Sequence, residues 1–190
     1  MLTVASTLKF VWYYWKVNWQ GAMEFRASFL TQMIAMMINN AVWIAFWGIY
    51  FTKFPVVNGW ELRDILILWG ISTGGYGWVI ALFGNTLRVA PMIATGQLDY
   101  YLTLPKNVLL HMLVSRMSFS AWGDYFFSWI MFFIAGGLSL SLFVKYLFAQ
   151  FLVGILFLAV FLIGQSLAFY FGNAEGLAQQ IFIAMVTFTT

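Results

Sequence analysis

Long uncharged apolar runs alternate with short polar stretches along this chain, and the pattern predicts membrane-spanning helices. No charged residue occurs within 27–52 or within 65–87. Each run reaches the roughly 20 residues that a helix needs to cross a bilayer. We therefore expect a first span over 27–52 and a second over 65–87, with Pro55, Asn58 and Gly59 in the short loop between them.

A third span is expected over 110–135, with Arg116 near one end and Asp124 deep inside. One central Asp costs about 2.5–3.5 kcal/mol, whereas each Leu, Ile, Phe or Val returns about 0.3–0.6 kcal/mol, so the apolar neighbours offset the acid. The turn after this span would lie at Gly136. A span shifted to 121–142 would place Asp124 nearer the interface, and both registers stay open.

The rest of the chain predicts a fourth span over 144–171 and the beginning of a fifth over 176–190. The last 15 residues (190 minus 175) are too few for a crossing that takes about 20. A partial fifth span is therefore expected.

The N-terminal stretch 5–25 predicts a helix that lies in the headgroup zone. At about 100° per residue, its large apolar side chains fall on one side and its polar ones form a neighbouring stripe. The apolar side holds Leu8, Trp12, Trp15 and Trp19, and the stripe holds Lys9, Tyr13, Lys16, Gln20 and Glu24. Aromatic cover with a basic edge is typical of an interfacial helix. A frayed leader is the alternative.

The polar window Arg88–Asn107, RVAPMIATGQLDYYLTLPKN, separates the second and third spans. Pro91 suits a first helical turn and Gly96 a helix end. Asp99 can cap a second short helix, which must stop before Pro105. Pro105 would then begin the next helix.

The second short helix would have an apolar face made by Leu98, Tyr101 and Leu102. With Leu98 and Leu102 exposed, such a helix would be poorly suited to water alone. We expect a partner protein to cover it.

Polar and small residues inside the spans predict contacts between helices. Asn39 and Asn40 lie near the middle of the first span, and an amide in hydrocarbon needs a partner. Asp124 can hydrogen-bond to Ser118, Ser120 or another helix, or serve transport. A stripe of small residues in the second span would let another helix approach closely. It comprises Gly70, Gly74, Gly77, Ala81 and Gly84.

Composition excludes a water-soluble domain and several kinds of site. Of the 190 residues, 63% are hydrophobic and only 8% are charged, whereas soluble domains have about 25% charged residues. One histidine and no cysteine leave no thiolate site and no multi-histidine metal site. No G-x-x-x-x-G-K-[ST] loop occurs, so ATP is not bound in the P-loop manner. The fold class is an all-α polytopic membrane protein.

The basic residues predict a cytoplasmic N-terminus. With the N-terminus inside, the inner side carries six Lys and Arg residues and the outer side three, and the positive side is cytoplasmic. The inner residues are Lys9, Lys16, Arg26, Arg88, Lys106 and Arg116, and the outer ones are Lys53, Arg63 and Lys145. The polar window then lies in the cytoplasm.

The run IATGQLDYYLTLPKNVLL, with Arg88 upstream, resembles the cytoplasmic signature of ABC-2 type transporter permeases, the membrane subunits of bacterial ABC exporters. The resemblance extends over the whole chain. Its residues are Arg88, Ile93, Gly96, Leu98, Asp99, Leu102, Pro105 and Asn107. Such permeases have six spans with an extracellular hairpin region between the last two, so this chain is expected to lack C-terminal spans.

The resemblance implies a permease subunit in the bacterial plasma membrane, paired with a second permease subunit as a homo- or heterodimer. It implies a separate ABC ATPase that binds ATP and Mg, so the chain itself needs no cofactor. The substrate would be hydrophobic or amphipathic, and the eight signature residues would couple the two subunits. Two alternatives stay open: a membrane enzyme acting on lipid through His111, Arg116 and Asp124, and a structural membrane subunit.

Overall fold

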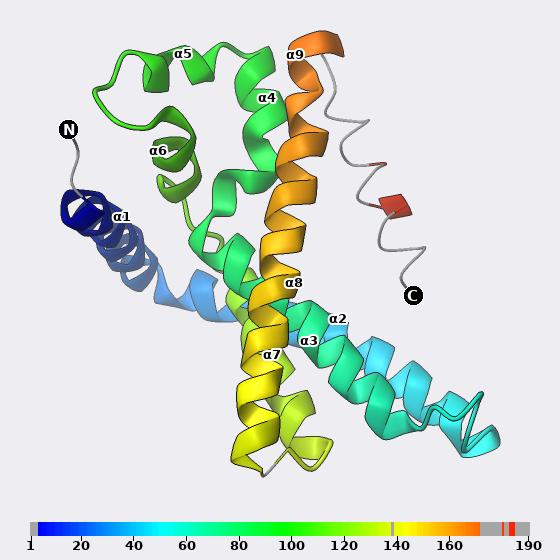
Figure 1. Cartoon of the computed structure of the whole chain (residues 1–190). Helices are drawn as coiled ribbons and strands as arrows, with labels where there is room; N and C mark the ends of the chain where they lie inside the picture. Colours follow the sequence, from blue (N-terminus) through cyan, green and yellow to red (C-terminus); the bar gives the residue numbers. More distant parts are fainter. Residues whose placement is uncertain (1–3, 138, 172–179, 181–182, 185–190) are drawn as a thin grey trace. The chain divides into compact units, whose positions relative to one another are not determined.

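The computed structural model describes residues 4–137, 139–171, 180 and 183–184. Within this part of the chain the regular elements are all helical (Figure 1). In chain order they are α1 (Val4–Glu24), α2 (Arg26–Lys53), α3 (Leu62–Leu82), the 3₁₀ helix η1 (Gly84–Arg88), α4 (Val89–Ala94), α5 (Gln97–Leu102), α6 (Val108–Val114), α7 (Ala121–Ile134), α8 (Leu140–Ser166) and α9 (Ala168–Phe171).

Among the described residues, three stretches are long and apolar enough to cross a membrane: α2, α3 and the run 140–171 formed by α8 and α9. These confirm an all-α polytopic fold. α2 extends one residue beyond the predicted span at each end, and α8 begins four residues before the predicted start. The expected partial fifth span falls outside the described residues, apart from three single positions.

The expected second span begins three residues too late and ends five residues too late. α3 ends at Leu82, and the chain continues as η1, in which the amide of Gly84 donates to the carbonyl of Arg116 at 2.8 Å. Residues 83–87 are uncharged, so hydropathy alone does not reveal this end. A pairing between distant parts of the chain determines it.

The expected third span is not one helix. The segment divides into α6 and α7, with residues 115–120 between them. Ser115 and two further serines lie in this interval, and serine competes for backbone hydrogen bonds outside helices. The Ser115 hydroxyl donates to the carbonyl of Met112 at 2.8 Å. α7 alone covers about 21 Å, less than a hydrocarbon core of about 30 Å.

The turns that join the long helices depend on specific residues. Asn58 and Gly59 both have positive φ, 51° and 83°, in a tight turn closed by two backbone bonds between Val57 and Trp60. This is the backbone geometry of a type I′ turn, which Asn-Gly favours. α7 ends before Gly136, which has φ 77°. The turn expected there is confirmed.

The described chain groups into two compact units. The first unit contains 1–21, 82–118 and 157–190, and the second contains 22–81 and 119–156, each as far as it is described. Buried Val89, Met92, Met112 and Leu113 form the core of the first unit. In the second, Leu66, Phe127, Met131 and Ala135 pack together.

Candidate functional site: the α4–α5 segment

Gly96 determines how the polar window folds. It adopts φ 73°, a left-handed conformation that costs glycine little. Its amide donates to Ile93 at 3.1 Å, which ends α4, and its carbonyl accepts from Asp99 at 3.2 Å, which begins α5. One residue therefore ends the first short helix and starts the second. Pro91 lies in the first turn of α4, as expected.

The role assigned to Asp99 as the cap of α5 is wrong. Gly96 occupies the cap position, and Asp99 lies in the first turn. Gly96 both ends α4 and occupies the N-cap of α5, so α5 starts earlier than expected. The Asp99 carboxylate is exposed, and it lies near the positive end of the helix dipole.

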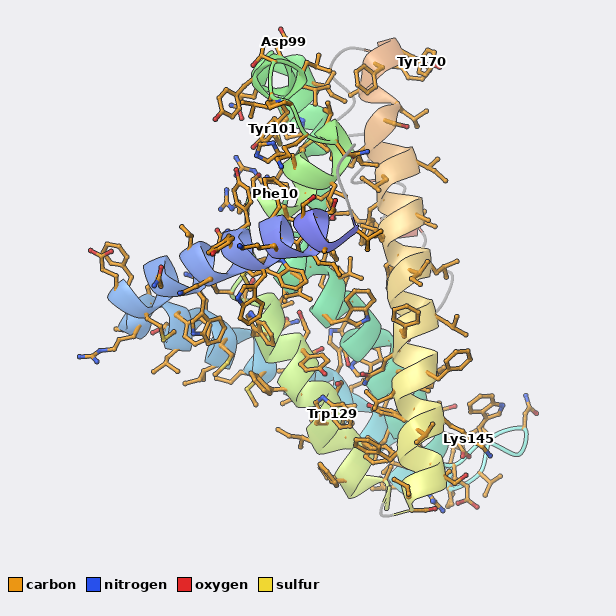
Figure 2. All side chains as sticks on the ribbon, turned by 60° about the vertical axis from the view of Figure 1, so that its left-hand side comes forward. Phe10, Asp99, Tyr101, Trp129, Lys145 and Tyr170 are labelled. Atoms are coloured by element: carbon orange, nitrogen blue, oxygen red, sulfur yellow. The ribbon has the colours of Figure 1, made fainter. Side chains whose placement is uncertain are left out.

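The expected exposure of α5 is correct for Leu102 and wrong for Leu98. Leu102 is 60% exposed, whereas Leu98 packs against the core of the first unit. The Tyr100 side chain, which the sequence did not single out, is 64% exposed. We call Asp99, Tyr100 and Leu102 the outer face of α5. In Figure 2 Asp99 lies at the tip of this segment.

The inner face of α5 is held by Tyr101. Its hydroxyl shares a 2.9 Å hydrogen bond with the Ser115 hydroxyl, and its ring lies edge-on to His111 at 5.1 Å. Asn85 donates to the same Ser115 hydroxyl and to the carbonyl of Met112, both at 2.8 Å. α5 is therefore tied to η1 and α6.

The remaining signature residues play separate structural parts. Pro105 lies in the turn and does not begin α6, because Asn107 caps that helix by accepting from the amide of Leu110 at 3.0 Å. Ile93 packs against the core. Arg88 is exposed at the end of η1.

Gln165 of α8 anchors α4, a role that the sequence analysis missed. Its side-chain oxygen accepts from the amide of Ala90 at 2.7 Å, and its nitrogen donates to the carbonyl of Leu87 at 3.3 Å. Ala90 is in the first turn of α4, whose amides have no partner inside the helix. The available signal was a lone amide side chain within an apolar run.

His111 joins α6 to α1. The Tyr14 hydroxyl and the His111 Nε2 share a 2.6 Å hydrogen bond, and the ring of Phe10 lies edge-on to His111 at 5.0 Å. Burial raises the pKa of Tyr14, and the phenols of Tyr100 and Tyr101 add to this shift. Tyr14 therefore remains a neutral phenol at physiological pH.

Asp124 pairs with Asn40 in the second unit. The Asn40 side-chain nitrogen donates to Asp124 Oδ1 at 2.6 Å, and both residues are buried. Asn39, in contrast, is exposed. Asp124 lies in the first turn of α7. Two of the residues named for the alternative of a lipid-modifying enzyme thus have different partners. Asp124 contacts α2, whereas His111 contacts α1.

The small residues of α3 lie against α7 and α8. Gly70, Gly74 and Gly77 are buried, and a Cβ on Gly77 would lie 2.7 Å from the Tyr125 amide. Ala81 is also fully buried. Gly84 lies in η1, where a Cβ would be 2.8 Å from the Ser118 amide. Each position requires a small side chain.

A cluster of polar side chains lies between α3, α7 and α8. Gln150 of α8 donates to the Ser128 hydroxyl at 3.1 Å, and the Tyr146 hydroxyl donates to the Ser128 carbonyl at 2.6 Å. Gln150 also reaches the carbonyl of Gly70 at 3.4 Å. These bonds satisfy polar groups that hydrocarbon could not.

Comparison with known proteins gives one family. A family model described as ABC-2 family transporter protein matches residues 22–190. No curated protein and no solved structure matches the chain.

Proposed function

The chain belongs to the ABC-2 family of transporter proteins, and from this premise we propose that it is a permease subunit driven by a separate ATPase subunit. Its long apolar helices make it a membrane protein. Membership makes it a transporter subunit rather than an enzyme. In our proposal the ATPase contacts the outer face of α5, formed by Asp99, Tyr100 and Leu102.

The observation that supports this proposal is the difference in exposure between the two sides of α5. Tyr100 and Leu102 are more than half exposed, while Leu98 and Tyr101 pack inward. Two large apolar side chains beside one carboxylate are suited to a groove on a partner protein, because aromatic and apolar anchors dominate such contacts. α5 is tied to η1 and α6 by hydrogen bonds on its inner face. A displacement of its outer face would therefore also move these elements.

Two connections would transmit that force. α4 is attached to α8 through Gln165, and α6 is attached to α1 through His111 and Tyr14. The ATPase moves the permease only if it binds one permease state more tightly than the other. In our proposal ATP-dependent closure of the ATPase displaces α5, and α4 pulls on α8.

We also propose export of a hydrophobic or amphipathic substrate from the cytoplasm, by a homo- or heterodimer of permeases in the bacterial plasma membrane. The basic-residue asymmetry, six inside against three outside, supports a cytoplasmic N-terminus. Maleimide labelling of intact cells tests this orientation. Asn58→Cys should be labelled from outside and Thr95→Cys should be protected.

Substitution of the outer face tests the proposal. Tyr100→Ala with Leu102→Ala should leave membrane insertion and amount unchanged, because neither side chain is part of a core. Loss of two interface anchors worth about 1–2 kcal/mol each should weaken recovery of the ATPase subunit about tenfold or more. Substrate-stimulated ATP hydrolysis should fall with it.

Ile38→Ala is the matched control, since Ile38 of α2 is exposed to the same 60% as Leu102. It should leave ATPase recovery unchanged. Asp99→Ala should also keep the fold and reduce only recovery. Full transport by the double variant would refute the assignment of this face.

A further inference from the structure

A cavity of about 200 Å³ lies among α3, α7 and α8, at the end where α7 turns into α8. It lies wholly within the second unit. Ile71 of α3, Phe132 of α7, and Leu142 and Ala149 of α8 contribute to its apolar wall. Arg63 of α3 and Lys145 of α8 also line it.

The apolar wall is rigidly built. The rings of Phe132 and Tyr146 lie 4.5 Å apart, and the Tyr146 hydroxyl is fixed by its bond to the Ser128 carbonyl. Gly137 must remain glycine, because a Cβ there would lie 2.5 Å from the Phe132 ring. The side chains that form this wall are therefore held in place by their own contacts.

The two cations form no ion pair in the part of the chain that the structure describes. Neither Arg63 nor Lys145 has an ion pair or hydrogen bond with any other described residue, and both side chains are exposed. The Arg63 guanidinium reaches over the turn, 4.0 Å from the position of a Cβ on Gly136. Arg63 lies in the first turn of α3, whose amino end adds partial positive charge, and Lys145 lies in the second turn of α8.

We propose that this cavity binds one acidic phospholipid. Its phosphate would lie between Arg63, which can bind it through two N–H groups, and Lys145. The beginning of one acyl chain would enter between Ile71, Phe132 and Leu142. The placement follows from the fold, since cations at the ends of membrane helices reach toward the headgroup layer.

The volume and the outer surface of α8 favour a lipid over a compact ligand. Pockets that enclose drug-sized molecules have about 300–1,000 Å³, so this cavity holds only part of its ligand. From Lys145, exposed Phe148 and Leu152 continue along the same side of α8. They would carry the rest of the acyl chains outside the cavity.

Native mass spectrometry of the purified full chain tests the site. The chain is titrated in detergent with phosphatidylglycerol, with phosphatidylcholine of the same acyl chains, and with glycerol phosphate. We expect one retained phosphatidylglycerol, weaker retention of phosphatidylcholine, and no retention of glycerol phosphate, which lacks the chains. Arg63→Gln with Lys145→Gln should weaken phosphatidylglycerol binding about tenfold for each cation removed.

Two further variants separate the site from general charge attraction. Ala149→Phe fills the cavity and keeps both cations, so it should also abolish the retained lipid. Lys53→Gln removes an exposed cation at the end of α2 and should change nothing. A melting curve of each variant shows that it remains folded.

Equal binding of the two phospholipids would overturn the proposal, as would unchanged binding by the double-glutamine variant. Equal loss in Lys53→Gln would show general attraction of charge and would also overturn it. Retention of glycerol phosphate alone would identify an anion site without a lipid. The site does not depend on the ATPase contact, so failure of either proposal leaves the other standing.

Discussion

Three buried amide side chains make specific connections between the described helices of this protein. Asn40, Gln150 and Gln165 each lie in an otherwise apolar helix, are buried, and donate to or accept from another element. A buried polar group without a partner costs about 1–3 kcal/mol, so each amide strongly favours one arrangement of its neighbours. These three connections are therefore specific.

Asn40→Leu should lower the melting temperature of the detergent-solubilised protein, because it leaves the Asp124 carboxyl buried without its donor. The expected loss is about 1.5–3 kcal/mol, the range for hydrogen bonds to charged groups. Asn40→Leu combined with Asp124→Leu should recover most of it. Asn39→Leu, at the exposed neighbouring position, should have little effect, and an equal loss there would contradict the pairing.

The sequence predicted that amides in the first span need a partner, but not which amide has one. α2 is apolar on all sides, so its pattern does not reveal which side faces α7. The same limit applies to α5, where a start at Gly96 rather than Asp99 leaves Leu98 inside and Tyr100 outside. In both cases the phase of the helix depends on contacts with distant residues.

At the scale of elements, the second unit is built on the close packing of α3 against α7 and α8. The glycines recur along one stripe: a Cβ on Gly70 or Gly74 would collide with side chains of α7 and α8, and one on Gly77 with the backbone of α7. The stripe was visible in the sequence because small residues in an apolar helix have few other uses. The division of the third predicted span was missed because residues 115–120 add only one charge to a long apolar run, although three serines lie there.

Gly77→Ala should destabilise the protein, because its Cβ would lie 2.7 Å from the Tyr125 amide, a backbone atom that cannot turn away. Overpacking of this kind costs about 1–3 kcal/mol. Gly48→Ala is the control, since a Cβ on Gly48 meets nothing within 4 Å. Thermal aggregation followed by size-exclusion chromatography should separate the two variants. Equal stability would show that α3 and α7 are less closely packed.

At the scale of the whole molecule, the apolar runs identify a membrane protein. The polar window Arg88–Asn107 carries the proposed contact with the ATPase. The three spanning stretches and the position of the window follow from hydropathy alone. The contacts of the window with α8 and α1 do not, because they join residues 75 and 97 positions apart. Those contacts turn a polar loop into a firmly held segment with one free face.

Site-specific crosslinking at α5 tests the coupling role most directly. The chain contains no cysteine, so a single introduced cysteine carries the crosslinker without further changes. Leu102→Cys and Tyr100→Cys, on the outer face, should crosslink to the ATPase subunit with a yield that changes when ATP is added. Leu98→Cys, on the inner face of the same helix, should not. Crosslinking of Leu98→Cys as readily as Leu102→Cys, or of Leu102→Cys to lipid and other spans only, would contradict the account.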